Sequence, residues 1–227
     1  MTTGLPDIAG RTVGELVAED FRRAPVFKRF GIDFCCGGGG PLGAVCEKKG
    51  LNVEEVAAAL ADAPAAGAGR DDLRVASWSP AFLADYIVNQ HHSYVRSQTP
   101  ALLAFTEKVA RVHGPARPEL VDIAALFAEV AEELFSHMSD EETQVFPRIR
   151  DGAPAAELAG AIERLEAEHE RAGALMAEIR RLADDFRLPA GACATYRAAF
   201  VNLEAFEDDL HRHVHLENNV LFPKVAV

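Results

Sequence analysis

Two segments of the chain repeat one arrangement of acidic residues, histidine and proline. They read EELFSHMSDEETQVFP and DDLHRHVHLENNVLFP, which align without a gap. Residues four apart in a helix lie on one face, with Cβ atoms about 6 Å apart. His137 and Glu141 can therefore point into one interior, and His213 and Glu217 can do the same. Two matched copies favour a metal site over two chance surface salt bridges, because imidazole and carboxylate groups are common metal ligands.

A single histidine precedes each copy at nearly the same distance. His92 lies 45 residues before His137 (92 to 137), and His169 lies 44 residues before His213 (169 to 213). Each half thus supplies one helix with a histidine and one with His-x-x-x-Glu. His91 is the alternative ligand to His92, since adjacent helix residues point about 100° apart. The predicted ligands are His92, His137, Glu141, His169, His213 and Glu217.

The donor set predicts a pair of metal ions. Each carboxylate can bridge two ions and each imidazole binds one, so each metal receives two nitrogens and two oxygens. Open positions remain for a bridging oxygen species and a small ligand. Mixed nitrogen and oxygen donors with open positions favour iron that changes oxidation state, although residue types alone also allow zinc or manganese. We therefore predict two non-haem iron ions with an oxo or hydroxo bridge.

Two further acids lie next to the predicted ligands in sequence. Glu133 precedes His137 by four residues and shares its helix face, and Glu168 is adjacent to His169. Both are candidate catalytic residues, which could form hydrogen bonds to the ligands or handle protons. For Glu133, an ordinary solvated acid is the equally weighted alternative.

The elements that position these residues are predicted to be helices. The pattern contains no alternating β-branched run of strand type, so the fold class is all-α: an up-down four-helix bundle. Ser79-Pro80 and Thr99-Pro100 each give a helix-start signal, which predicts an extra helix between the first and second members of the bundle. The predicted helices span residues 80–97, 100–113, 118–149, 153–186 and 191–222.

A small helical domain is predicted ahead of the bundle. It carries capping signals at Thr12 and Asn52, a helix over residues 42–49, and the pair Cys35 and Cys36 followed by four glycines. Small residues, proline and glycine near residues 61–72 indicate a linker. The predicted domains are 1–63 for the Cys-Cys domain, 64–76 for the linker and 77–227 for the bundle.

Composition narrows the classes of partner. The chain has 227 residues and a formal net charge of −12, which argues against nucleic acid and against anionic membranes. Neither a signal peptide nor an apolar run of about 18 residues is evident, so we expect a cytoplasmic protein. Four cysteines spaced this way are a poor disulfide framework, and we expect reduced thiols. We expect a monomer or a homodimer.

These motifs resemble those of haemerythrin-like domains, whose His-His-Glu pattern occurs twice around a di-iron centre. The segment IDFCCGGGG ahead of such a bundle is similar to the repair-of-iron-centres family, the iron–sulfur cluster repair di-iron proteins. The resemblance covers residues 13–223. It implies Glu141 and Glu217 as bridging carboxylates, with Glu133 and Glu168 as acids close to the metals.

The resemblance also implies a function under nitrosative and oxidative stress. Family members help to restore damaged iron–sulfur proteins by donating iron or by handling nitric oxide. Two alternatives are an O2- or NO-binding sensor or store without turnover, and an enzyme that reduces NO at the di-iron site. Whether the chain is an enzyme stays open at this point.

The cysteine pair has two competing interpretations. Cys35 and Cys36 can engage iron, a nitrosyl iron species or a client's cluster, or can be redox active, because the glycines keep the thiols accessible. Alternatively, the motif builds a tight buried turn. Cys46 and Cys193 are predicted to be buried structural residues.

Overall fold

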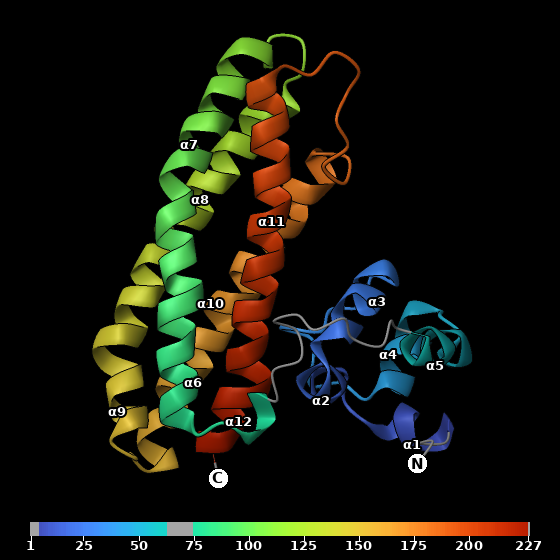
Figure 1. Ribbon diagram of the computed structural model, residues 1–227, viewed down its shortest axis with the longest axis vertical. Helices are drawn as coiled ribbons and strands as arrows, with labels where there is room; N and C mark the ends of the chain where they lie inside the picture. The colour runs from blue at the N-terminus through green and yellow to red at the C-terminus, as the bar shows by residue number, and fades with distance from the viewer. Residues whose placement is uncertain (1–4, 63–74, 227) are drawn as a thin grey trace. The chain divides into compact units, whose positions relative to one another are not determined.

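The fold was determined as a computed structural model, which describes residues 5–62 and 75–226 (Figure 1). These residues form helices and turns, and their only β-type pairing is an isolated bridge between Thr12 and Pro41. The all-α prediction is confirmed. Contacts divide the chain into two compact units, one formed by Met1–Leu83 with Val214–Val227 and the other by Ala84–His213.

The second unit is a helical bundle. Its long helices α7, α8, α10 and α11 run alongside one another, and α8 packs against both α7 and α10 (Figure 1). The ring of Phe206 on α11 meets the ring of Phe127 on α8 edge-on, with centroids 5.3 Å apart. The elements from Pro80 on are α6 (Pro80–Ile87), η4 (Val88–His92), α7 (Ser93–His113), α8 (Glu119–Asp140), η5 (Glu141–Val145), α9 (Phe146–Arg150), α10 (Ala155–Leu182) and α11 (Ala194–Leu216).

The prediction of a new helix at Thr99-Pro100 is wrong. Pro100 lies inside α7, which continues to His113. Proline within a helix costs about 3 kcal/mol, because it removes a hydrogen bond and clashes with the preceding turn. The helix carries a buried stripe at spacings of three and four residues that packs against α8, and the burial of this stripe outweighs the cost. The stripe is Val95, Thr99, Leu102, Thr106 and Val109.

The first unit contains short helices with well-defined ends. Thr12 caps α2 in a capping box with Glu15, as predicted, and the Asn52 side chain accepts from the backbone N–H of Glu54 to cap α5. The helix that Thr12 caps ends at Glu19, since Asp20 is extended (φ −153°) and starts a new turn. The elements are α1 (Leu5–Gly10), α2 (Val13–Glu19), η1 (Phe21–Arg23), α3 (Ala24–Arg29), α4 (Leu42–Lys49), α5 (Val53–Ala61), η3 (Val75–Ser77), η6 (Glu217–Leu221) and α12 (Phe222–Val225).

The predicted linker falls largely on residues 63–74, which lie outside the described residues, so the domain boundaries 1–63, 64–76 and 77–227 remain predictions.

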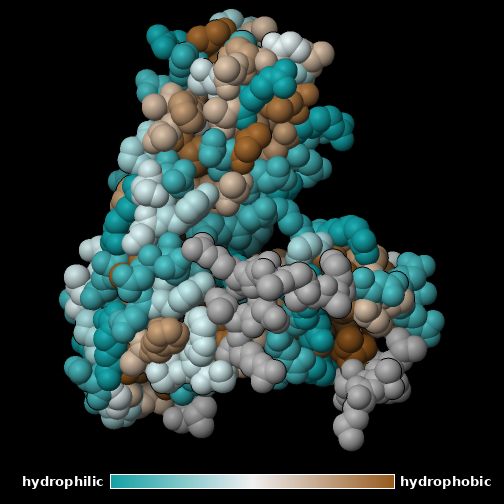
Figure 2. All heavy atoms as spheres, viewed as in Figure 1, coloured by the Kyte–Doolittle hydropathy of each residue, from teal (hydrophilic) through white to brown (hydrophobic). Residues whose placement is uncertain are grey.

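The visible face in Figure 2 is mainly hydrophilic, with more apolar side chains toward the end of the bundle where α7 and α8 are joined. Among the residues that the structure describes, no helix has both the length and the apolar character needed to cross a bilayer.

Candidate metal centre

The buried face of α8 runs from apolar core directly into the ligand candidates. Its buried positions recur at spacings of three and four residues, which is the repeat of a helix face that packs inward. His137 is 5% exposed and Glu141 is fully buried, so both polar side chains occupy core positions. The stripe is Leu120, Ile123, Phe127, Val130, Leu134, His137 and Glu141.

Three ligand candidates lie on π-helical turns. His92 ends the π-helical segment η4, while Glu141 begins η5 and Glu217 begins η6. In η5 the N–H of Phe146 donates to the carbonyl of Glu141, five residues back, and the second repeat makes the same bond. Pro147 follows, and a wider turn accommodates a proline that would clash with a regular one. The Phe-Pro ending of each repeat thus has a structural role, and π turns often occur at functional sites.

Glu141 lies at the centre of converging nitrogen atoms. Its Oε2 is 3.2 Å from Nε2 of His92 and 3.4 Å from Nε2 of His137, yet neither carboxylate oxygen has a hydrogen-bond partner. The Nε2 atoms of His137 and His169 are 3.0 Å apart. Ligands held about 2.1 Å from one ion are about 3.0 to 3.4 Å from each other in octahedral or tetrahedral geometry. The buried donors therefore fit a metal better than they fit one another.

Two overlapping groups of described residues could each hold an ion. In each group the ligand atoms lie within 4.8 Å of one another, and all of the side chains are buried. Glu141 and Glu217 occur in both groups. The first group is His92, Glu141, His213 and Glu217, and the second is His137, Glu141, His169 and Glu217.

Two acids contact the outer ring nitrogens of two of the candidate ligand histidines. Nδ1 of His92 is 2.7 Å from Glu142, and Nδ1 of His137 is 2.7 Å from Glu168. Burial raises the pKa of Glu142, but hydrogen bonds from Arg96 and His92 outweigh it and lower that pKa below its ordinary value. The hydrogen bond from His137 lowers the pKa of Glu168. An ionised carboxylate only accepts, so each Nδ1 donates and each Nε2 presents its lone pair to the interior.

Comparison with known proteins identifies both parts of the chain. The family model described as Hemerythrin HHE cation binding domain matches residues 83–225, and one described as Domain of Unknown function (DUF542) matches residues 9–64. The iron-sulfur cluster repair protein YtfE of Enterobacter sp. (strain 638) is 35% identical, over 93% of this chain and 94% of the relative. The protein of the same name from Pectobacterium carotovorum subsp. carotovorum (strain PC1) is 36% identical, over 94% of this chain and 96% of the relative.

This chain belongs to the iron–sulfur cluster repair family. The resemblance inferred from the two His-x-x-x-Glu segments and the Cys-Cys motif is therefore confirmed. Within this family member, the residues predicted as metal ligands are the ones that make up the two buried groups. His91, the alternative to His92, lies outside both groups, and its Nδ1 is 3.0 Å from Asp209.

The other predicted acid, Glu133, lies outside the two groups. Its Oε1 is 2.6 Å from a guanidinium nitrogen of Arg171. Glu142, by contrast, was not predicted as a site residue, although it holds His92 as Glu168 holds His137. The signal available in the sequence was its position directly after the predicted ligand Glu141.

The Cys-Cys loop of this family member is tightly fixed. The side chain of Asp33 accepts from the backbone N–H groups of Cys35, Cys36 and Gly37. Contrary to the expectation of accessible thiols, Cys35 is buried, and only Cys36 is partly exposed. The neighbouring Cys36 thiol and burial raise the pKa of Cys35 well above its ordinary value, so Cys35 stays protonated at neutral pH.

The same loop contacts the segment that carries a ligand candidate. The side chain of Asn219, two residues after Glu217, donates to the carbonyl of Cys35 at 2.9 Å. A Cβ atom at Gly38 would lie 2.6 Å from the backbone carbonyl oxygen of Phe34 and 2.5 Å from Oδ1 of Asn219, so a larger residue there would force the loop to shift. Elsewhere, Cys46 is buried as predicted, but Cys193 is exposed and lies 3.4 Å from Nε2 of His113, which corrects the structural role expected for it.

Removing either acid that holds a ligand histidine is expected to weaken iron binding at one position. Loss of such a partner costs about 10- to 100-fold in metal affinity, because the imidazole loses its orientation. Glu142→Ala should act on the position that uses His92, and Glu168→Ala on the one that uses His137. Iron titration against a competing chelator measures the effect. Glu166→Ala, an exposed acid on α10, is the matched control, and equal affinities in all three variants would contradict the assignment.

Proposed function

We propose that this chain repairs damaged iron–sulfur clusters and that it does so with two non-haem iron ions held in the helical bundle. The observation that carries the proposal is the pair of buried His/Glu groups that share Glu141 and Glu217. Shared carboxylates are suited to bridging two ions, and each ion then receives two imidazoles of its own. The names of the relatives supply the kind of client, a damaged iron–sulfur protein.

The protein contributes orientation and burial to this site. Glu142 and Glu168 fix the tautomers of His92 and His137, so that Nε2 faces the interior without competing protons. The apolar residues that form the buried face of α8 continue directly into His137 and Glu141, so these two side chains lie in a surrounding that excludes water. Bound iron would supply a centre that changes oxidation state and accepts a small ligand such as NO or O2 at open positions.

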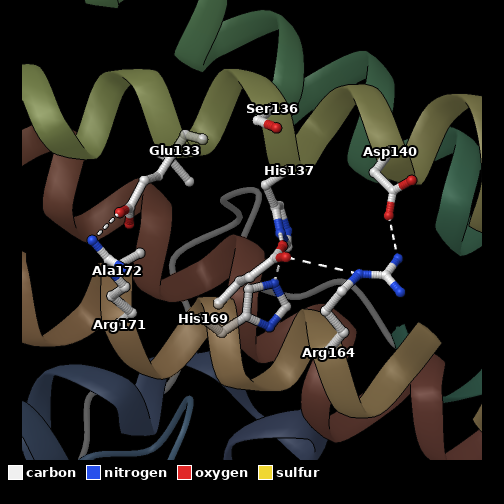
Figure 3. A pocket seen from close by; sticks show the side chains of 10 residues that line it. Glu133, Ser136, His137, Asp140, Arg164, His169, Arg171 and Ala172 are labelled. Carbon is white, nitrogen blue, oxygen red and sulfur yellow. Dashed lines mark hydrogen bonds and ion pairs between the residues drawn. The ribbon is translucent and has the colours of Figure 1, made fainter. Parts of the chain in front are cut away.

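An opening in the bundle supports iron donation as the repair step. A pocket of about 620 Å³ lies between α8 and α10, and its lining includes His137 and His169 (Figure 3). Iron held as cargo can therefore reach solvent from one position of the pair without unfolding of the bundle. The other position, which uses His92 and His213, has no residue in the lining of this pocket.

The function is tested with isotopically labelled iron. The chain is loaded with ⁵⁷Fe and mixed with an enzyme whose cluster has been damaged by NO, and both label transfer and recovered activity are measured. We expect both to occur with the loaded chain and neither with the metal-free chain. Recovery without iron would contradict the proposal, and a stable reversible O2 adduct without transfer would favour the sensor or store.

Replacing Cys35 and Cys36 together with serine is expected to abolish repair while iron loading stays at its normal level. The two thiols and Asp33 form a further group within ligand distance, outside the buried His/Glu groups, so their loss leaves the bundle ligands intact. Recovered client activity and bound iron are measured in parallel. Cys46→Ser is the control for loss of a thiol. Full repair by the double variant would show that the motif only builds a buried turn.

A further inference from the structure

The pocket between α8 and α10 has an ordered arrangement of charge around its opening. Its lining places His137 and His169 between two arginines of α10, with Arg164 on one side and Arg171 on the other (Figure 3). Each arginine reaches across to a carboxylate of α8. The pocket therefore reaches two ligand candidates and is flanked on both sides by contacts that tie α10 to α8.

On one side, Arg171 binds two acids of α8. Its Nη2 lies 2.6 Å from Glu133 and 2.8 Å from Glu129. On the other side, Arg164 pairs with Asp140 of α8, and its Nε is 3.9 Å from Glu168, one turn further along α10. Glu168 in turn holds Nδ1 of His137. The two cross-helix pairs thus span the pocket at both ends of the exposed ligand edge.

These ion pairs are weak enough to break and re-form readily. The side chains of Arg164 and Arg171 are 51% and 62% exposed, and ion pairs at such exposure stabilise a protein by only about 0 to 1 kcal/mol. Release of both arginines would leave acidic oxygens along the way to His137 and His169. With the arginines in place, part of the acidic charge at the opening is neutralised, and an approaching cation meets two guanidinium groups.

We propose that Arg164 and Arg171 are gating residues, which control how fast ferrous iron enters and leaves through the pocket between α8 and α10. The assignment rests on the proposed function, because it takes iron as the cargo. The carboxylates of Glu129, Glu133, Asp140 and Glu168 outnumber the two guanidinium groups, so the opened passage carries negative charge and suits a divalent cation. A gate raises the barrier in both directions, so it changes rates and leaves the equilibrium affinity nearly unchanged.

The test uses the full chain with Arg164→Gln and Arg171→Gln combined. Ferrous iron is loaded anaerobically, and uptake and release to a coloured ferrous chelator are followed by stopped flow. We expect both rates to rise by about tenfold or more, the lower end of the range over which charge lining a cleft alters the approach of ions. Iron content at saturation and the circular dichroism of the helices should match the wild type.

The matched control removes the same charge elsewhere. Arg181→Gln with Arg187→Gln also deletes two exposed arginines, each paired with an acid three residues away, and neither lines the pocket. This control should exchange iron at the wild-type rate. Faster uptake with slower release in the pocket variant would show a distant charge effect and would overturn the gate. Unchanged rates in an iron-loaded pocket variant would overturn this inference alone, whereas a wild-type chain that holds no iron would overturn the proposed function and the gate together.

Discussion

Replacing Glu141 with alanine is expected to remove both iron ions, whereas replacing His169 with alanine should remove one. Glu141 belongs to both buried groups, while His169 belongs to only one of them. Iron per chain should therefore fall from about two to near zero in Glu141→Ala and to about one in His169→Ala. Metal analysis of the purified, iron-reconstituted proteins measures these values directly.

Two comparisons make the result specific. Glu132→Ala changes an exposed acid of the same helix and should leave about two irons per chain. His213→Ala should behave like His169→Ala, because it removes a ligand from the other group. Loss of both ions from each single histidine variant would instead mean that the two positions fill only together. Full iron content in Glu141→Ala would exclude it as a shared ligand.

The second large effect concerns stability. Glu141→Met is expected to destabilise the protein in the presence of iron and to stabilise the metal-free protein. Iron at about 1,000 times its Kd adds about 4 kcal/mol to the free energy of unfolding, and its loss should lower Tm by about 8 to 16 °C. Without iron, the fully buried carboxyl group has no hydrogen-bond partner, so its replacement by an apolar side chain should recover about 1 to 3 kcal/mol.

Thermal unfolding of both proteins, with iron and after chelation, checks the two signs together. Leu134→Met, on the same buried face of α8, should change stability by less than about 1.5 kcal/mol in either state. A metal-free Glu141→Met protein that is less stable than metal-free wild type would contradict the view that Glu141 is an unfavourable buried group kept for binding.

The convergence of the candidate ligands could be predicted, because the two copies of the repeat carry the same pattern of histidine and glutamate. His137 and Glu141 share a helix face with the apolar stripe of α8, so the spacing that predicts the helix also predicts the inward direction. Pro100 misled the prediction, because a local helix-start signal takes no account of the packing of α7 against α8. The π-helical turns were not predicted either, because the spacing of the histidines and glutamates was interpreted as that of a regular α-helix.

The sequence could not predict which side chains from distant segments contact one another. Glu142 contacts His92, which lies 50 residues earlier in the chain, and no local sequence pattern predicts that pair. The burial of Cys35 likewise depends on Asp33 and on the segment around Asn219, which lies far along the sequence. A glycine-rich motif therefore suggested an open loop where tertiary hydrogen bonds build a closed one.

The most direct test of the paired metal site is a crystal structure of the iron-loaded protein with anomalous data collected at the iron edge. Two anomalous peaks are expected, one beside His92, Glu141 and His213 and the other beside His137, Glu141 and His169. A single peak, or peaks away from Glu141, would contradict a metal pair bridged by that carboxylate.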